Sequence, residues 1–233
     1  RLPVALAGGA VTQELLVNIT PQETRVAVLD NGSVQEIHIE RSRSRGLVGN
    51  IYLGEVSRVL PGMQAAFIDA GLQRTAFLHA SDIHASQALV DPPTIEPRSI
   101  QHLLREQQRI LVQVVKDPIG GKGARLTTQI AIPSRYLVLL VDNPGVGVSA
   151  RIESSAERDR LRGIGTSLLA GDRNSGCIFR TAAEGASEPA LTRDWQFLQR
   201  VWASIHERSR IAQPRTLLHE DLPLMLRVLR DSV

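Results

Sequence analysis

The stretch from Gly49 to Leu78 constrains the fold of this chain more than any other. Two turn signals, Pro61-Gly62 and Ala70-Gly71, divide it into three short runs of strand-forming residues. Because only a few residues separate the runs, they are expected to pair with their sequence neighbours. The stretch therefore predicts a three-stranded antiparallel meander.

Two aromatic residues, Phe67 and Phe77, fall in neighbouring strands of this meander. Aromatic residues make up only 3% of the sequence, so a pair on adjacent strands calls for an explanation. A small barrel can present such rings on its outer face as a platform on which nucleic-acid bases stack. The rings can also fill the barrel core, and the pattern alone favours the core.

Strand-like alternation continues on both sides of the meander. Residues 14–20, 24–30 and 33–40 predict three antiparallel strands, with a hairpin turn at Asn31-Gly32. Residues 109–116 and 124–130 also alternate, and a glycine-rich turn joins them. With the meander they make five strands, which fit a closed OB-type barrel from about Gly46 to Thr128.

Between these strands, residues 82–97 contain three prolines and no periodicity, which predicts a long surface loop. One or two helical turns are expected within residues 98–106.

The hydrophobic pattern changes in the second half of the chain, where strand-like and helix-like segments alternate. This pattern predicts an α+β arrangement. Residues 136–141 form a continuous apolar strand, and a turn at Asn143-Pro144-Gly145 leads into a second strand over residues 146–152. Helices are expected at 154–170 and 190–206, with a strand at 176–180 between them. The two tryptophans of the later helix fall on its apolar stripe and are expected in the core.

The last residues predict a helix capped by Asp221, with Pro223 in its first turn. Its apolar stripe is unfinished at Val233, which suggests that the natural protein continues.

The 233 residues carry a net charge of +3, and only Lys116 and Lys122 among the basic residues are lysines. Arginine suits bidentate phosphate contacts, although genome composition produces the same excess equally well. The single cysteine, Cys177, excludes an internal disulfide framework and a multi-cysteine zinc site, and it favours a reducing cytoplasm. No apolar run is long enough to cross a bilayer.

Six motifs occur in one order along the chain: Gly-Asn-Ile-Tyr, Gln-Ala-Ala-Phe-Ile-Asp-Ala-Gly, Ala-Phe-Leu-His, Gly-Lys-Gly-Ala-Arg-Leu-Thr-Thr, Pro-Ser-Arg-Tyr-Leu-Val and Phe-Arg-Thr-Ala-Ala-Glu-Gly. Together these motifs resemble the amino-terminal half of the ribonuclease E/G family. The sequence Pro133-Ser134-Arg135 is more similar to the G branch than to the E branch.

The resemblance implies an α+β fold of four parts. Residues 1–45 would be the first part of an RNase H-like subdomain, and residues 46–128 an inserted OB-type RNA-binding barrel. Residues 129–217 would form a 5′-sensor subdomain, and residues 218–233 the truncated start of the returning RNase H-like helix.

The resemblance also implies a set of RNA-binding residues. Phe67 and Phe77 carry over as base-stacking residues, which reverses the preference for the core, and Lys122 as a contact to the phosphate backbone. The pocket for a 5′-monophosphate carries over as Arg180, Thr181, Val138 and Ser134. An Arg-Thr pair can clamp a terminal phosphate, but alone it is more often an ordinary strand end.

The implied function is recognition of RNA within a single-strand-specific endoribonuclease that processes or degrades 5′-monophosphorylated RNA, including rRNA. The implied partners are that RNA and further copies of the full-length protein, without a membrane. Hydrolysis would use Mg²⁺ held by paired aspartates beyond Val233, so no catalytic or metal-binding residue is expected in this chain, which alone would be inactive. The acid pairs Asp69/Asp82 and Glu220/Asp221 have surface or capping spacing. The alternative is a non-catalytic OB-fold RNA-binding protein of translation or transcription.

Overall fold

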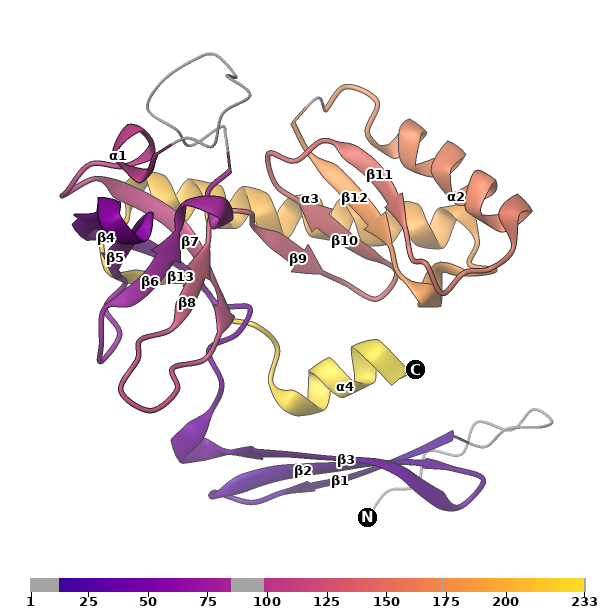
Figure 1. Ribbon diagram of the computed structural model, residues 1–233. Helices are drawn as coiled ribbons and strands as arrows, with labels where there is room; N and C mark the ends of the chain where they lie inside the picture. Colours follow the sequence, from indigo (N-terminus) through magenta and orange to yellow (C-terminus); the bar gives the residue numbers. More distant parts are fainter. Residues whose placement is uncertain (1–12, 85–98, 173, 233) are drawn as a thin grey trace. The chain divides into compact units, whose positions relative to one another are not determined.

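The computed structural model describes residues 13–84, 99–172 and 174–232 (Figure 1). Its contacts divide the chain into two compact units, Arg1–Gly46 with Leu222–Val233, and Leu47–Asp221. The expected loop at residues 82–97 lies almost wholly outside the described residues. Within the described ranges, no helix combines the length and the apolarity needed to cross a bilayer.

The first unit contains the three expected strands in an antiparallel sheet of order β1-β2-β3. These strands are β1 (Gln13–Ile19), β2 (Glu23–Asp30) and β3 (Ser33–Arg41). Between β2 and β3, Asn31 and Gly32 have φ angles of 48° and 76°. Two left-handed residues in succession give the turn whose twist matches a hairpin, so the prediction from Asn-Gly is confirmed.

Helix α4 (Leu224–Ser232) packs on β2 of the same unit. Leu224 and Val228 meet Val26 and Val28 in a small buried cluster. The expectation that Asp221 caps this helix is wrong, because the helix begins three residues later. The backbone N–H of Asp221 instead donates to Asn50 Oδ1 at 2.9 Å, within the second unit.

The second unit begins with the predicted barrel. Strands β4 (Ile51–Leu60), β5 (Ala65–Asp69), β6 (Ala76–His79), β8 (Arg125–Thr127) and β7 (Arg109–Lys116) follow one another, and β7 pairs back with β4. This closure confirms the five-stranded OB-type barrel in an α+β chain. One turn of helix, α1 (Ile100–Leu103), adds Ile100 to the barrel core.

A sixth strand, β13 (Thr216–His219), joins the barrel and was not predicted from the sequence. It pairs antiparallel with β4, placing Thr216 opposite Leu53 and Leu217 opposite Tyr52. Four residues are too few for the hydrophobic pattern to identify a strand, and the pairing joins segments more than 150 positions apart.

The second half of this unit is a four-stranded sheet of order β11-β12-β10-β9. Its strands are β9 (Ala131–Pro133), β10 (Leu137–Leu140), β11 (Gly145–Val148) and β12 (Gly176–Phe179). The second strand expected over residues 146–152 is β11, which ends at Val148. Strand β12 lies between β10 and β11, parallel to β11 and antiparallel to β10. The helix between β11 and β12 supplies the crossover that parallel strands require.

Helices α2 (Ser155–Leu168) and α3 (Glu188–Ile211) pack on this sheet (Figure 1). Their buried residues share one core with the sheet, including Leu161 of α2, Trp195 of α3, Leu137 and Phe179. The fit between α2 and the sheet is close, because a Cβ at Gly165 would come within 2.6 Å of Val146. Ser154 caps α2, since its hydroxyl accepts from Glu157 N–H at 3.3 Å.

Four 3₁₀ turns complete the described elements: η1 (Ser42–Ser44), η2 (Pro61–Met63), η3 (Ala80–Asp82) and η5 (Thr181–Ala183). The finer domain boundaries expected at 45/46, 128/129 and 217/218 stay predictions.

Candidate nucleic-acid interface

The two barrel phenylalanines lie on the outer face of the barrel. Phe67 of β5 and Phe77 of β6 are directly opposite each other, with ring centroids 6.4 Å apart and planes at 68°. Their strand neighbours Ala66, Ile68 and Leu78 are fully buried in the core, whereas both rings are partly exposed. Because side chains alternate between the two faces of a strand, burial of these neighbours turns the rings outward. The core placement favoured by pattern alone is therefore wrong.

Cationic side chains flank the two rings along one line of the barrel. Strand pairing places Arg58 of β4 opposite Phe67, and Arg125 of β8 opposite Phe77. Lys116 of β7 is in turn opposite Arg125. Directly opposed residues project to the same face of a sheet, so the rings lie between cations. Such a row offers stacking surfaces for bases beside charges for phosphates.

The members of this row differ in how firmly they are held. The guanidinium of Arg125 donates to Asp82 Oδ2 at 3.0 Å and is ion-paired with it at 2.9 Å. Arg58 is exposed and makes no hydrogen bond or ion pair with any residue that the structure describes. Its charge is therefore left for a ligand more fully than that of Arg125.

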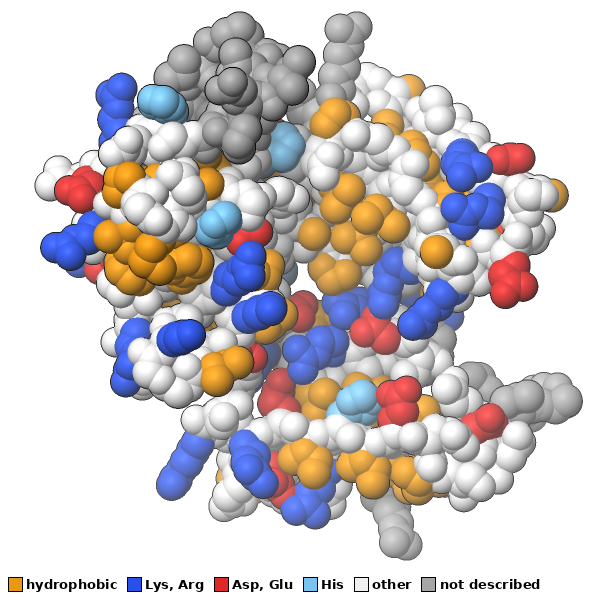
Figure 2. Space-filling model, in the orientation of Figure 1, with side chains coloured by type: hydrophobic (Ala, Val, Ile, Leu, Met, Phe, Trp, Pro, Cys, Tyr) orange, Lys and Arg blue, Asp and Glu red, His pale blue; other side chains and the backbone are white. Residues whose placement is uncertain are grey.

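Lys122 lies in the glycine-rich turn between β7 and β8 and is exposed. The turn is closed by the Lys122 N–H, which donates to Ile119 O at 3.1 Å, and by Arg74, whose guanidinium donates to Gly121 O at 2.5 Å. Lys and Arg side chains gather over this end of the barrel, where β6 and β8 meet their loops (Figure 2). The turn thus holds a cation near the edge of the aromatic row.

The next residue, Gly123, explains why the turn follows this path. A Cβ at Gly123 would lie 2.0 Å from the carbonyl oxygen of Thr75, a distance that no side chain tolerates. Glycine alone lets the turn lie against the strand that carries Phe77.

Arg180 and Thr181 follow the carboxyl end of β12. Since β11 and β12 are parallel, their ends meet at one edge of the sheet, where Ser149 follows β11. The hydroxyls of Ser149 and Thr181 are hydrogen-bonded at 3.2 Å. The Arg180 guanidinium donates to Ser134 O at 2.6 Å, and its backbone N–H donates to Tyr136 O at 2.8 Å. One edge of the sheet thus carries a guanidinium and a pair of hydroxyls.

Ser134 contributes to this edge through its backbone. Its side chain is buried, and its hydroxyl donates to Asp194 Oδ2 of α3 at 2.5 Å. The same carboxylate oxygen accepts the N–H groups of Tyr136 and Leu137, at 3.0 and 3.1 Å. Asp194 thereby fixes the turn whose carbonyl holds Arg180, and the Ser134 hydroxyl is directed away from that arginine's contact.

Val138 lies on the face of the sheet opposite the buried Leu137 and Leu139. Its register partners are Ile178 and Pro133, and all three side chains are half-buried. Figure 2 shows hydrophobic side chains over the part of the view where Figure 1 places β9, β10 and β12. Arg180 follows Ile178 by two residues, so strand periodicity places it on the same side. An apolar surface thus adjoins the guanidinium.

Ion pairing on α2 supports the loop that follows Thr181. Glu157 accepts from Arg160 at 2.6 and 2.7 Å and from the Gly185 N–H at 2.9 Å. The hydrogen bonds from Arg160, and next that from Gly185, lower the pKa of Glu157 to about 2. Because the carboxylate stays ionised, it ties α2 to the segment between Thr181 and α3.

Three residues of these surfaces were missed from the sequence: Arg58, Ser149 and Asp194. Alternation in residues 51–60 signals a strand but not which residue lies opposite Phe67, because a bulge shifts the register near Arg58. Ser149 and Asp194 come from other strands and helices, so only the folded chain brings them to Arg180 and Ser134. The roles of all seven predicted site residues in RNA binding stay predictions.

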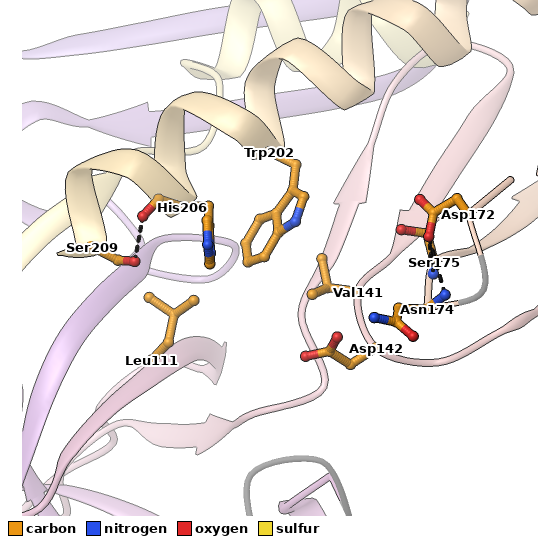
Figure 3. Close-up of a pocket in the computed structure, with 9 residues that line it drawn as sticks. All are labelled: Leu111, Val141, Asp142, Asp172, Asn174, Ser175, Trp202, His206 and Ser209. Carbon is orange, nitrogen blue, oxygen red and sulfur yellow. Dashed lines mark hydrogen bonds between the residues drawn. The ribbon is translucent and has the colours of Figure 1, made fainter.

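A separate hollow of about 470 Å³ lies between the barrel and the second half of the unit (Figure 3). Leu111 of β7 and Trp202 and His206 of α3 form one side, with Asp142 and Asp172 across from them. The Trp202 and His206 rings are 5.8 Å apart. None of its described lining residues is a lysine or arginine, so this hollow does not suit a phosphate.

The acidic pairs considered as metal ligands are engaged elsewhere. Asp69 is ion-paired with Arg215 at 3.1 Å, and Asp82 with Arg125. Over residues 13–84, 99–172 and 174–232, no three His, Cys, Asp or Glu side chains lie close enough together to hold a metal ion. The Mg²⁺ expected for the full-length enzyme stays a prediction.

Comparison with known proteins gives consistent matches. A family model described as the ribonuclease E/G family matches residues 131–233. The chain is 54% identical to ribonuclease G of Escherichia coli K12 over 224 residues, which are 95% of this chain and 45% of that protein. It is 49% identical to ribonuclease G of Haemophilus influenzae, over 94% of this chain and 45% of that protein.

Similarity to ribonuclease E is lower. The chain is 38% identical to ribonuclease E of Nostoc sp. PCC 7120, over 91% of this chain and 30% of that protein. The chain thus spans less than half the length of these relatives. The 54% identity to ribonuclease G extends over 95% of the chain, and the structure contains a closed OB-type barrel. We conclude that this chain belongs to the ribonuclease E/G family and is most like ribonuclease G.

Proposed function

We propose that this chain is the RNA-recognition part of a single-strand-specific endoribonuclease that prefers RNA with a 5′-monophosphate. The observation that carries the proposal is the edge formed by Arg180, Thr181 and Ser149. There the Arg180 guanidinium is held by Ser134 O at 2.6 Å, and the same edge carries two hydroxyls 3.2 Å apart. A guanidinium and hydroxyl donors are the groups that recognise the oxygens of a terminal phosphate.

The half-buried Val138 adjoins this edge and gives the first base an apolar surface. The outer face of the barrel supplies the second contact to the RNA. There Phe67 and Phe77 stack on bases, while Arg58 and Lys122 contact phosphates. The barrel thus binds single-stranded RNA generally, and the edge at Arg180 selects among 5′ ends. A triphosphate adds charge and bulk that a site of one guanidinium and two hydroxyls does not match.

Cleavage belongs, in this proposal, to residues outside this sequence, because the chain covers only 45% of the length of E. coli ribonuclease G. Those residues would hold the Mg²⁺ of the full-length enzyme, which would act in the cytoplasm on transcripts that include rRNA and would assemble from identical subunits. Incubation of this chain with Mg²⁺ and RNA is expected to leave the RNA intact. Cleavage that copurifies with the chain would contradict this part of the proposal.

The 5′-end preference is tested with short single-stranded RNAs that differ only in carrying a 5′-hydroxyl, monophosphate or triphosphate. We expect the monophosphate to bind most tightly. Replacing Arg180 by alanine should remove that advantage, because it removes charge-assisted hydrogen bonds to the phosphate. The binding free energy of the 5′-monophosphate RNA should fall by about 2 kcal/mol, which corresponds to roughly 30-fold in affinity. Affinity for the 5′-hydroxyl RNA should change little.

Thr181→Val keeps the shape of the side chain and removes its hydroxyl, so it should lose part of the same preference. Arg210→Ala, at an exposed position of α3, is the charge-matched control and should keep it. Equal affinity of the unchanged chain for all three RNAs would sink the 5′-end proposal. It would favour the alternative of a general OB-fold RNA-binding protein.

A further inference from the structure

Helix α3 has two distinct faces. Leu191, Trp195, Leu198 and Ile205 are buried against the sheet. A second set recurs at intervals of four, three, four and four residues, which places its members along one line of the helix. This set, here called the α3 stripe, consists of Arg193, Phe197, Arg200, Ser204 and Arg208.

The aromatic member of the stripe is unusually open. Phe197 is 50% exposed, whereas Trp195 on the inner face is only 3% exposed. Leaving a phenyl ring in water forgoes much of the free energy that its burial provides, and the sheet-facing side of the same helix has room for larger aromatic rings. The packing of α3 on its sheet does not account for the position of Phe197.

Two arginines of the stripe have no acidic partner among the residues that the structure describes. Arg193 and Arg200 are exposed and form no hydrogen bond or ion pair with any residue in the described ranges. Arginines on α2 contrast with them, because Arg160 pairs with Glu157 and Arg162 with Asp159. A helix surface that only needed solubility would be expected to show such pairs here too.

Arg208 is held in place without losing its charge. Its guanidinium donates to the backbone carbonyls of Leu218 and Leu217, at 2.5 and 3.3 Å. Glu207, next to Arg208, is an acidic residue of α3 at the margin of the stripe, and Glu220 follows His219 at the margin of the adjoining hollow. The stripe itself consists of three arginines, a phenylalanine and a serine, and carbonyl bonding orients Arg208 in advance.

The stripe borders a hollow of about 360 Å³ between α3 and β13. Phe197, Arg200, Ser204 and Arg208 line it from the helix, and Leu218 and His219 line it from the strand. With a rise of 1.5 Å per residue, Phe197 and Arg208 are about 16 Å apart along the helix. The surface is thus long enough for more than one nucleotide, and the hollow is within the usual size of small-ligand sites.

We propose that the α3 stripe is a further binding surface for single-stranded RNA, with Phe197 stacking on a base and Arg193, Arg200 and Arg208 contacting phosphates. This inference rests on the proposed function in that RNA is the ligand. An exposed ring between unpaired guanidiniums is the combination that single-strand binding uses. An acidic peptide would use the charges but gains less from an isolated phenyl ring.

The test compares three variants of the whole chain: Phe197→Ala, Arg200→Ala and the control Arg210→Ala. The control removes the same charge from the same helix on a different face. We expect Phe197→Ala to weaken binding of a single-stranded RNA about 5- to 100-fold. Arg200→Ala should reduce the slope of log affinity against log salt concentration by about 0.7. Arg210→Ala should bind like the unchanged chain.

The ratio of affinities for 5′-monophosphate and 5′-hydroxyl RNA should stay unchanged in the stripe variants. The Arg180→Ala variant tests the 5′-end proposal, and the stripe variants test RNA binding by the α3 stripe. The two proposals can therefore fail separately. Unchanged affinity and salt slope in both stripe variants would overturn the inference. So would loss of self-association, or of binding to a poly-glutamate peptide, while RNA affinity stays intact.

Should Phe197→Ala unfold the chain, the pair Phe197→Tyr and Phe197→Leu decides the matter. Tyrosine keeps a stacking ring and should retain RNA affinity, whereas leucine keeps the apolar bulk alone and should lose it. Equal affinity of these two variants would contradict stacking. Photocrosslinking with RNA that contains 4-thiouridine should label the peptide containing residues 193–208, and labelling confined to the barrel would contradict the proposal.

Discussion

The carboxylate of Asp194 on α3 accepts a hydrogen bond from the hydroxyl of Ser134 at 2.5 Å. Ser134 belongs to the turn between β9 and β10, and its carbonyl holds Arg180 at 2.6 Å. A residue of α3 thus fixes the turn whose carbonyl oxygen holds the Arg180 guanidinium. The link joins three separate segments of the chain.

Replacing Asp194 by alanine is expected to destabilise the fold. The change leaves the N–H groups of Tyr136 and Leu137 without their acceptor and leaves the Ser134 hydroxyl only Leu137 O, at 3.0 Å, which should lower the free energy of unfolding by about 3 kcal/mol. Urea denaturation measures this change. Ser134→Ala removes one of the three donors and should cost about 1 kcal/mol, whereas Gln196→Ala, at an exposed position of α3, should cost almost nothing. Equal effects of Asp194→Ala and Gln196→Ala would refute the role given to this carboxylate.

Phe67→Ala should weaken RNA binding while the barrel stays folded. The ring is partly exposed and outside the core, so its loss removes a stacking surface worth about 1 to 3 kcal/mol per base. Titration of a short single-stranded RNA gives the affinity, and thermal unfolding checks the fold. Ile68→Ala, at the next position and fully buried, should instead reduce stability by about 2 to 4 kcal/mol. A variant at Phe67 that loses stability as strongly as the variant at Ile68 would show that the ring is structural.

Lys122→Ala should weaken binding to all single-stranded RNAs alike. A lysine in an exposed turn contacts phosphate and not base edges, so its removal should lower the salt dependence by about 0.7 in log-log slope without altering sequence preference. Affinity measured over a range of salt concentrations tests this. Arg58→Ala is expected to behave similarly, because Arg58 lies opposite Phe67 with no described partner. An unchanged slope of log affinity against log salt concentration in both variants would show that neither residue contacts the RNA phosphates.

Glu157 should make the second unit sensitive to acid. Its pKa is about 2 in the folded chain and near 4.5 when unperturbed. A carboxylate with a depressed folded pKa adds stability that is fully present above about pH 4.5 and is lost as the pH falls toward 2. Thermal unfolding between pH 5 and pH 2 should show this loss, and Glu157→Gln should flatten that part of the profile. Identical slopes in the two proteins would argue against the ion pair with Arg160.

Cys177 should resist thiol reagents in the folded chain. It is completely buried, and burial raises the pKa of its thiol to about 11. Both effects suppress the reactive thiolate at pH 8. Reaction with a thiol-specific chromogenic disulfide should therefore be slow in buffer and rapid in urea, and fast labelling under native conditions would show that β12 opens readily.

Much of the fold could be read from local pattern. The Asn31-Gly32 turn, the meander around Phe67 and the cap of α2 at Ser154 each depend on a few neighbouring residues, whose preferences agree with the final structure. The order of β11 and β12 and the addition of β13 depend on partners far away in sequence. No short-range signal records these pairings, so the sequence predicted the strand at β11 without its partner and missed β13.

The candidate site divides in the same way. Arg180, Thr181 and the two barrel phenylalanines could be selected from the sequence through family motifs, but pattern alone placed the phenylalanines in the core. Strand register decided otherwise, because small and aliphatic neighbours fill the barrel interior and leave the rings outside. Register also aligned Arg58 with Phe67, and a bulge makes that alignment unreadable from residue spacing.

The sequence by itself determined the family, the closed barrel and the identity of most site residues, since these follow from local turns, alternation and motif order. Only the tertiary structure decided that Ser134 acts through its carbonyl, that Asp194 holds the turn, and that Ser149 meets Thr181. It also decided that Phe197 shares an open face of α3 with two arginines that have no partner in the described part of the chain. The physical reason is that hydrogen-bond partners and exposure depend on which distant segments pack together, and packing is a property of the whole chain.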